Sequence, residues 1–245
     1  MEEIIEHLVG RINEAQMRAE PAPHIFVEGI FPAEFYKSIL EEFSAVTPAL
    51  EKQVHTGDPK IFFGSYGDRV EAHVPRDLGR MAPATAQFWS GLFTAFKSPA
   101  FLGAVKLKFE AGFRARFGDE AASPGFVERF RPNMLLTKHR SNYYLGPHTD
   151  IFSKVVTCVF NCAERDCLEH LGTALYAPKK AGFTCNGSVH HNPDLFVETG
   201  RLPFKMNSAL IFFRDDRFFH GVARLSDQDL MGSERPNIQF NLWNS

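Results

Sequence analysis

Two side chains in GPHTDIFSK, residues 146–154, have the types and the spacing of metal ligands. If this stretch is extended, His148 and Asp150 point to the same side, because residues two apart share one face of a strand. An imidazole nitrogen and a carboxylate oxygen directed into one space form half of a metal site. Alone the pattern is weak, since a chain with ten histidines contains about one such pair by chance.

A third ligand is available in FFRDDRFFHGVARL, where His220 stands at the start of an expected strand. Two histidines and one carboxylate occupy one face of a metal ion and leave adjacent coordination positions open, which suits iron(II) that works with dioxygen. Structural zinc sites are closed and leave no such position. Taken alone, a histidine here is more often a hydrogen-bonded rim residue than a ligand.

Arg235 lies fifteen residues beyond His220 and opens the run RPNIQFNLW, in which apolar Ile238, Phe240 and Leu242 alternate with polar residues. A guanidinium group can grip a carboxylate through two parallel hydrogen bonds, which the point charge of a lysine cannot imitate. We therefore expect Arg235 to hold the far end of a diacid. The alternative is a solvated charge at the end of a strand.

Taken in order, six pieces of the chain resemble the iron(II)/2-oxoglutarate-dependent oxygenases: YYLGPHTD, KVVTCVFN, HLGTALYAP, NSALIFF, FHGV and RPNIQFNLW. The resemblance covers about residues 130–245, and PAPHIFVEGIFPAEFYKSILEEF is similar to the lead-in helix of many bacterial members. It implies that His148, Asp150 and His220 bind iron(II). It also implies that Arg235 binds the 5-carboxylate of 2-oxoglutarate, with O2 as the second cosubstrate.

The activity that the resemblance implies is that of an oxidoreductase, a dioxygenase that releases succinate and CO2 from 2-oxoglutarate while it hydroxylates an unactivated C–H bond. Related halogenases have a small residue where Asp150 stands, so this carboxylate favours a hydroxylase over a halogenase. Desaturation, epoxidation and ring closure stay open. The size of the chain suggests a small, amino-acid-like metabolite as substrate, and a protein side chain, a nucleotide sugar or a lipid intermediate would undergo the same chemistry.

Two alternatives keep the same fold. In a cupin-like metal enzyme the substrate itself chelates the metal and 2-oxoglutarate is not needed. A non-catalytic binding protein retains the fold as a scaffold. Turnover that survives the loss of Arg235 favours the first alternative, and failure to bind iron(II) together with 2-oxoglutarate favours the second.

Secondary candidates follow from the same alternation. If the strand before His148 is extended, Arg140, Asn142 and Tyr144 lie on its face. We then expect Tyr144 to hydrogen-bond 2-oxoglutarate, and Arg140 and Asn142 to contact the substrate. Tyr143 is expected to replace Tyr144 if the glycine and proline before His148 shift the register.

The elements that must position these side chains change character near residue 130. Before it, the spacing of apolar residues predicts helices over 4–17, 31–43, 84–96 and 98–117, the last with Ser98 as its N-cap. After it, seven or eight short β-rich runs predict strands near 131–139, 154–163, 172–178, 194–200, 207–213, 220–225 and 236–243. The stretch 178–205 is expected to form a long hairpin or lid, with His190 and His191 exposed.

We therefore expect an α+β fold in one domain over residues 1–245, because no linker or repeat divides the chain. Residues 1–125 would be mainly helical support. Residues 126–245 would form an antiparallel jelly-roll barrel that carries the metal site. By the resemblance, this barrel is a cupin-like double-stranded β-helix.

The net charge of the chain limits the classes of partner that we expect. A formal charge of −2 leaves no basic excess for nucleic acid or an anionic membrane, so a small molecule is the expected partner. The acidic N-terminus and the lack of a long apolar stretch predict a soluble, cytoplasmic protein. The four cysteines contain no C-x-x-C pair and are expected to be reduced structural thiols. Monomer and homodimer stay open, since no heptad repeat or exposed apolar run demands a dimer.

Overall fold

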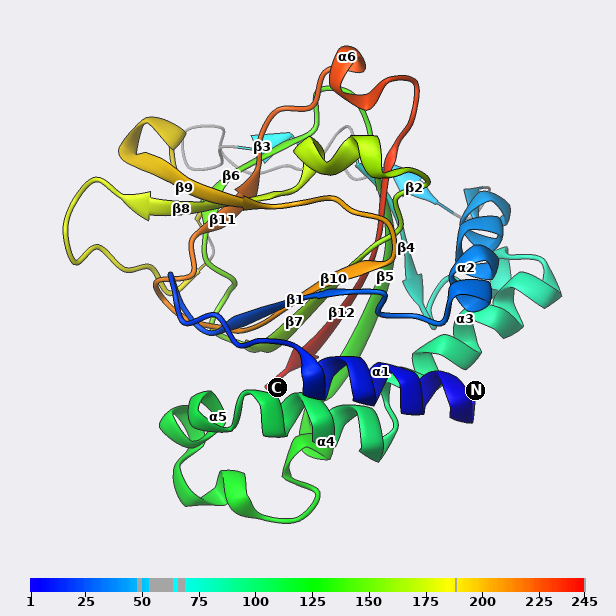
Figure 1. Cartoon of the computed structure of the whole chain (residues 1–245), viewed down its shortest axis with the longest axis horizontal. Coiled ribbons are helices and arrows are strands. Elements are labelled where there is room, and N and C mark those ends of the chain that lie inside the picture. The colour runs from blue at the N-terminus through cyan, green and yellow to red at the C-terminus, as the bar shows by residue number, and fades with distance from the viewer. Residues whose placement is uncertain (48–49, 53–63, 66–68, 188, 245) are drawn as a thin grey trace.

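Two antiparallel sheets lie face to face in the chain (Figure 1). The structure is a computed structural model that describes residues 1–47, 50–52, 64–65, 69–187 and 189–244. Within these residues the architecture is mixed α and β, as expected, and helices cover the outer side of the larger sheet. No helix of the described ranges is both long and apolar enough to cross a membrane.

The larger sheet has seven strands and the smaller sheet has five. In spatial order the larger sheet contains β1 (His24–Glu28), β10 (Ser208–Phe213), β7 (Lys154–Asn161), β12 (Arg235–Trp243), β5 (Arg131–His139), β4 (Arg69–Val74) and β2 (Glu51–Lys52). The smaller sheet contains β3 (Gly64–Ser65), β6 (Tyr144–His148), β11 (His220–Val222), β8 (Thr173–Pro178) and β9 (Phe196–Leu202). The seven strands expected after residue 130 are all present, and β6 is the eighth.

The helices also follow the apolar spacing of the sequence. They are α1 (Glu2–Glu14), α2 (Ala33–Ala45), α3 (Pro83–Phe96), α4 (Pro99–Lys108), α5 (Glu110–Phe117) and the short α6 (Asp227–Leu230), with single 3₁₀ turns at 78–80, 118–122, 126–129, 166–171 and 193–195. Ser98 caps α4 as predicted, because its hydroxyl accepts a hydrogen bond of 3.2 Å from the Phe101 amide. The single helix expected over 98–117 is wrong: the backbone leaves helical geometry at Phe109, with φ −110°, and divides it into α4 and α5.

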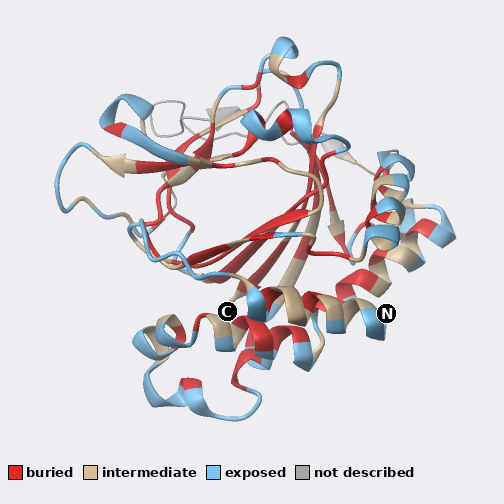
Figure 2. Ribbon diagram, in the orientation of Figure 1, coloured by how far each residue is buried: buried red, intermediate tan, exposed pale blue. Residues whose placement is uncertain are grey.

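Alternation along the strands gives the larger sheet one apolar face and one face that carries both polar and apolar side chains. On β12, Ile238, Phe240 and Leu242 are buried against the helices. Phe160 of β7 joins them and stacks on Phe96 of α3, with ring centroids 4.7 Å apart. Each such side chain contributes about 1.5–3 kcal/mol by leaving water. Figure 2 shows this buried layer where the helices meet the larger sheet. Because one face of the sheet packs on the helices, the other face is directed toward the smaller sheet.

The N-terminal half supplies strands as well as helices. β1 pairs with β10 at one edge of the larger sheet, and β4 pairs with β5 near the other. Sequence analysis did not predict these strands, since HIFVE and RVEAHV are short and lie beside strong helical patterns. The alternate residues Arg69 and Glu71 of β4 line the space between the two sheets.

Candidate active site

Strand pairing brings the two histidines of the predicted triad together. β6 and β11 are antiparallel neighbours, and His148 is the direct cross-strand partner of His220, with ring centroids 4.3 Å apart. The adjacent Gly221 permits this approach, because a Cβ atom at that position would collide with the carbonyl oxygen of Leu145 on β6. The distal histidine therefore reaches the H-x-D motif through the pairing of β11 with β6.

Backbone carbonyls fix the orientation of both imidazoles. His148 Nδ1 lies 3.0 Å from the Gly146 carbonyl oxygen, and His220 Nδ1 lies 3.0 Å from that of Phe218. A carbonyl can only accept, so each Nδ1 carries the proton and each Nε2 keeps its lone pair for a ligand bond. Burial lowers the pKa of both histidines, which keeps them neutral and able to ligate.

Asp150 completes the group just beyond the end of β6. Thr157 of β7 donates a hydrogen bond of 2.5 Å to its Oδ2, and the Lys154 ammonium donates one of 2.9 Å to its Oδ1. Burial raises the pKa of the Asp150 carboxyl, but the charge of Lys154 and the Thr157 hydroxyl together hold that pKa below its usual value. The carboxylate is therefore ionised and fixed in position.

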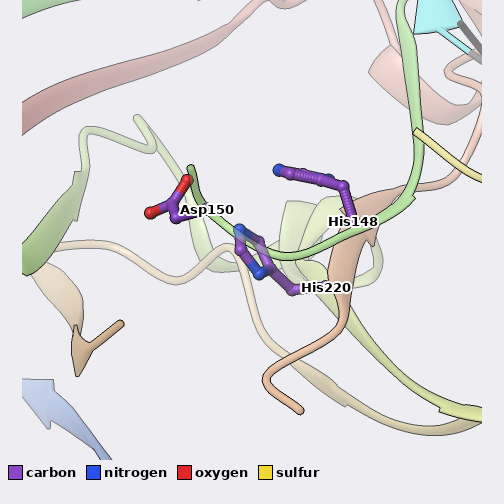
Figure 3. Close-up of side chains that lie close together, drawn as sticks. All are labelled: His148, Asp150 and His220. Atoms are coloured by element: carbon purple, nitrogen blue, oxygen red, sulfur yellow. The ribbon is translucent and has the colours of Figure 1, made fainter. Parts of the chain in front are cut away.

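The ligand atoms of His148, Asp150 and His220 all lie within 4.8 Å of one another (Figure 3). The set contains two neutral imidazole nitrogens and one carboxylate oxygen, which fits iron(II) or a similar divalent metal and leaves other coordination positions for small ligands.

The triad lies in a cavity between the two sheets. Its volume is about 480 Å³, and its walls include Leu135, Val159 and Leu210 of the larger sheet and Leu145 and Val222 of the smaller sheet. Cavities of about 300–1,000 Å³ commonly hold small ligands in proteins. The same cavity is lined by Arg235, so the predicted diacid-binding residue and the candidate metal ligands share one space.

Arg235 is a buried cation, with 2% of its surface exposed. Its Nε donates to the Leu171 carbonyl at 2.7 Å, and its Nη1 donates to His139 Nδ1 and to Asn237 Oδ1, both at 2.9 Å. Burial lowers the pKa of Arg235 to about 10, so the group is still charged at neutral pH. No carboxylate in the described part of the chain forms an ion pair with it, and Nη2 makes only a long contact of 3.5 Å to Thr173.

A chain of buried amides extends from Arg235 across the sheet. Asn237 accepts from Arg235, and its Nδ2 donates at 3.0 Å to Oδ1 of Asn161. Nδ2 of Asn161 then donates at 3.0 Å to the hydroxyl of Ser208. Ser208 donates to the Lys205 carbonyl at 2.8 Å. Because a guanidinium can only donate, it sets the direction of every bond in the series. This network holds the guanidinium in one orientation.

The secondary candidates are placed differently from expectation. The strand before His148, β6, begins only at Tyr144 and does not reach back to Arg140, because β5 ends at His139 and the chain turns between the two strands, with Asn142 at φ 69°. Asn142 is exposed, and Arg140 forms an ion pair of 2.7 Å with Glu234. Neither lies among the described residues that line the cavity.

A register shift within β6, between Leu145 and His148, decides which of two tyrosines lines the cavity. Tyr144 packs under the guanidinium of Arg224, at 4.2 Å, and is not among the described cavity residues. Tyr143, the substitute, lines the cavity and is 1% exposed. Its ring stacks on His139 with centroids 4.0 Å apart. Burial raises the pKa of Tyr143, so it stays a neutral hydroxyl group.

The segment between β8 and β9 lies against residues 147–151, which include the H-x-D motif. These strands form an antiparallel hairpin, and the amide of His191 in its long connection donates to the Pro147 carbonyl at 2.8 Å. Gly187 fits tightly there, since a Cβ atom would collide with Ile151. The expectation of exposed histidines is wrong: both are half-buried, and the His190 ring lies 4.5 Å from that of His148.

Sequence analysis missed several polar residues of the cavity, namely Arg69, Glu71, His139, Lys154 and Thr157. The alternation of RVEAHV and of KVVTCVFN was the available signal for Arg69, Glu71 and Thr157, because it places each of them on the face opposite the helices. The same alternation does not place Lys154 on that face. The cysteines agree with expectation: all four are free, and Cys158 and Cys162 are buried.

The sequence matches no model of a known protein family and no curated protein sequence. Solved structures nevertheless share the fold. A prolyl-4-hydroxylase from Pseudomonas putida superposes with a TM-score of 0.56 at 12% identity, over 97% of this chain and 99% of that one. This structure confirms, at the level of the fold, the resemblance to iron(II)/2-oxoglutarate-dependent oxygenases that the sequence suggested.

Two further structures are less similar. HygX from Streptomyces hygroscopicus, with nickel and 2-oxoglutarate bound, gives a TM-score of 0.48 at 11% identity over 91% of this chain and 83% of that one. A prolyl hydroxylase from Trichoplax adhaerens, in complex with a hypoxia inducible factor peptide, gives 0.48 at 9% identity over 98% and 88%.

Proposed function

We propose that this chain is an iron(II)- and 2-oxoglutarate-dependent dioxygenase that hydroxylates an unactivated C–H bond of a small, amino-acid-like metabolite. One observation carries the proposal. A facial group of two histidines and an aspartate shares a single cavity with a buried arginine that has no carboxylate partner in the described part of the chain. The fold shared with the Pseudomonas prolyl-4-hydroxylase supports it.

The proposal also specifies the type of β-fold. β5, β12, β7 and β10 of the larger sheet and β6, β11, β8 and β9 of the smaller sheet would together be a double-stranded β-helix. The N-terminal helices would buttress its outer face within one domain. The shared apolar layer between the helices and the larger sheet supports a single unit.

His148, Asp150 and His220 would hold the iron(II), which supplies the activation of dioxygen at the expense of 2-oxoglutarate. The protein prepares this site in three ways. The carbonyl oxygens of Gly146 and Phe218 keep the imidazoles in the tautomer that leaves Nε2 unprotonated. Lys154 and Thr157 hold the carboxylate still. The sheets on either side limit the access of water.

Arg235 would bind the 5-carboxylate of 2-oxoglutarate. A buried guanidinium without an acidic partner is costly unless a ligand supplies the opposite charge. Its Nε and Nη1 are used by the protein, which leaves Nη2 to face the cavity. The residue is therefore oriented in advance, and the carboxylate of the ligand completes its hydrogen bonds.

The proposal extends to the reaction outcome, the partner and the location of the protein. The carboxylate of Asp150 favours hydroxylation over halogenation, and release of succinate and CO2 would accompany it. A small-molecule partner fits the cavity volume, and the charge of −2 fits the absence of nucleic acid or membrane as partner. Four free cysteines fit a reducing, cytoplasmic location. Monomer and homodimer are both compatible with the proposal.

The test begins with anaerobic protein. Titration of iron(II) and 2-oxoglutarate should produce the weak visible absorption of a chelated complex, and admission of air should then release succinate. Arg235→Ala should raise the KM for 2-oxoglutarate by about 10- to 100-fold, the value of a hydrogen bond to a charged group. Arg114→Ala is a matched control, because Arg114 pairs with Glu110 on the exposed side of α5.

Two outcomes would replace the proposal. If turnover of a substrate continues without 2-oxoglutarate and survives Arg235→Ala, the chain is a metal enzyme whose substrate chelates the metal. If the protein binds no metal together with 2-oxoglutarate, it is a binding protein on this fold.

A further inference from the structure

An ion pair on β4 lines the cavity. Its two residues are far from the candidate metal ligands in the sequence. Arg69 and Glu71 are 8% and 5% exposed, and an Arg69 Nη2 to Glu71 Oε2 distance of 2.7 Å joins them. Both face the cavity, because residues two apart share one side of β4. Neither has a part in holding the metal or the cosubstrate in the function proposed above.

His139 lies beside this pair with a hydrogen bond donor to spare. It is the cross-strand partner of Arg69, and it is 1% exposed. Its Nδ1 accepts from Arg235, so the proton of the neutral ring lies on Nε2. Nε2 has no partner in the described part of the chain. The two ring nitrogens point in different directions, so this N–H is turned away from Arg235.

The neutrality of the ring follows from its position. Burial, together with the charges of Arg235 and Arg69, holds the pKa of His139 well below its usual value. An imidazole in this place is therefore a fixed N–H donor at neutral pH. A buried donor without an acceptor is costly, and a ligand that supplies an acceptor removes that cost.

The charges are arranged for a ligand that carries both signs. A buried ion pair contributes little to stability compared with apolar residues of the same volume, so the fold alone does not require one here. Arg69 and the His139 N–H offer donors to a carboxylate. Glu71 offers an acceptor to an ammonium group, beside the His73 ring that already lies 2.8 Å from its Oε1.

We infer that Arg69, Glu71 and His139 form a second ligand subsite of the cavity, distinct from Arg235, that binds the carboxylate and the ammonium group of a free amino acid. The inference rests on the proposed function and specifies its substrate class. The carboxylate binds Arg69 and His139, and the ammonium binds Glu71. The side chain of the amino acid is then left to extend toward the triad within the same cavity.

The experiment uses matched sets of compounds with the full chain, iron(II) and 2-oxoglutarate. Each set contains a free L-amino acid, its N-acetyl derivative, its carboxamide and the corresponding amine without a carboxylate. Succinate release above the substrate-free rate is the measurement. Free amino acids should stimulate it, and each analogue that lacks one charge should lose about 10- to 100-fold in kcat/KM.

Two substitutions connect each charge to its residue. Glu71→Gln should reduce the discrimination between the amino acid and its N-acetyl derivative to less than about 3-fold, while discrimination against the carboxamide persists. Arg69→Gln should do the reverse. A purely structural role would lower activity on all compounds alike and leave both ratios unchanged. Glu234→Gln is the control, because Glu234 pairs with Lys138 and Arg140 outside this cavity and should keep both ratios.

The possible results distinguish failure of the amino-acid subsite from failure of the proposed oxygenase function. If peptides or uncharged metabolites stimulate succinate release and free amino acids do not, the subsite inference is overturned and the oxygenase proposal stands. If no compound stimulates it and 2-oxoglutarate does not bind, the oxygenase proposal has failed. If Glu71→Gln does not fold, the unsubstituted protein decides the matter. Equal kcat/KM for a free amino acid and for its analogues that lack one charge would overturn the inference.

Discussion

Arg235 and His139 are direct cross-strand partners in β12 and β5, and a hydrogen bond of 2.9 Å joins Nη1 of the first to Nδ1 of the second. The contact determines the proton position on the imidazole and one orientation of the guanidinium. It also lies between two groups of polar residues, the buried amide chain that begins at Asn237 and the cavity residue Arg69 on β4. Substitutions around this pair should therefore separate cosubstrate binding from stability.

The carboxylate of Asp150 depends on its hydroxyl neighbour. Thr157→Val removes the donor to Oδ2 at nearly constant volume and should weaken iron(II) affinity by about 10- to 100-fold, as is usual for partners of metal ligands. Dialysis against a metal buffer, followed by metal analysis, measures the change. Thr137→Val is the control, because Thr137 is also buried on β5 but contacts the Asn237 carbonyl. Equal affinity in both variants would contradict a role for the hydroxyl.

The amide chain should act on cosubstrate binding. Asn237→Leu removes the acceptor that orients Arg235, and we expect the KM for 2-oxoglutarate to rise by about 5- to 20-fold, the value of one buried hydrogen bond. Asn241→Leu serves for comparison, since Asn241 is equally buried on β12 but bonds Asn133 instead. Thermal unfolding of both variants shows how much of the effect is structural. A similar rise in KM for the two variants would exclude a specific role of Asn237.

Stability of the metal-free protein should depend on pH through His139. Because burial holds its pKa well below 6.5 in the folded chain, the unfolded chain binds a proton that the folded chain refuses as the pH falls below about 6.5. The native state is therefore fully favoured above that pH and loses stability on acidification. His139→Gln should make the slope shallower by up to about 1.4 kcal/mol per pH unit.

Urea unfolding at several pH values between 5 and 7.5 measures that slope. His170→Gln, at an exposed position on the 3₁₀ turn 166–171, should leave it as in the unsubstituted protein. Parallel curves for the His139 variant and the parent would show that this ring does not titrate as proposed.

Close approach at Gly221 should govern the geometry of the triad. Gly221→Ala places a methyl group against the Leu145 carbonyl, so β11 must move from β6, and we expect a loss of about 1–3 kcal/mol together with weaker metal binding. Gly103→Ala, in the middle of α4 with open space around it, should instead stabilise by about 0.5–1 kcal/mol. Unfolding curves and metal titrations of the two variants test this contrast.

Much of the site was predictable because it depends on local alternation. The pattern of RPNIQFNLW correctly assigned Ile238 and Phe240 to the core and left Arg235 and Asn237 for the opposite face. The H-x-D spacing correctly put His148 beside Asp150 in space.

The rest depends on tertiary pairing, which no local period encodes. Tyr143 replaced Tyr144 because the register of β6 against β11 shifts between Leu145 and His148, which displaces the alternation by one residue. Arg69 and Glu71 enter the cavity only because β4 adds to the edge of β5, a pairing over about 70 residues of chain. The amide chain was hidden for the same reason, since Asn161 and Asn237 meet only across two strands.

Successive residues along a strand of the larger sheet lie on different faces, one toward the cavity and one toward the helices. Arg235, Gln239 and Trp243 of β12 line the cavity, and Ile238, Phe240 and Leu242 pack with the helices. Substitutions that retune substrate choice can therefore accumulate on one set of positions while the other set keeps the scaffold intact. Such a chain is a suitable starting point for directed evolution toward new substrates, with Gln239, Leu135 and Val159 as the first positions to vary.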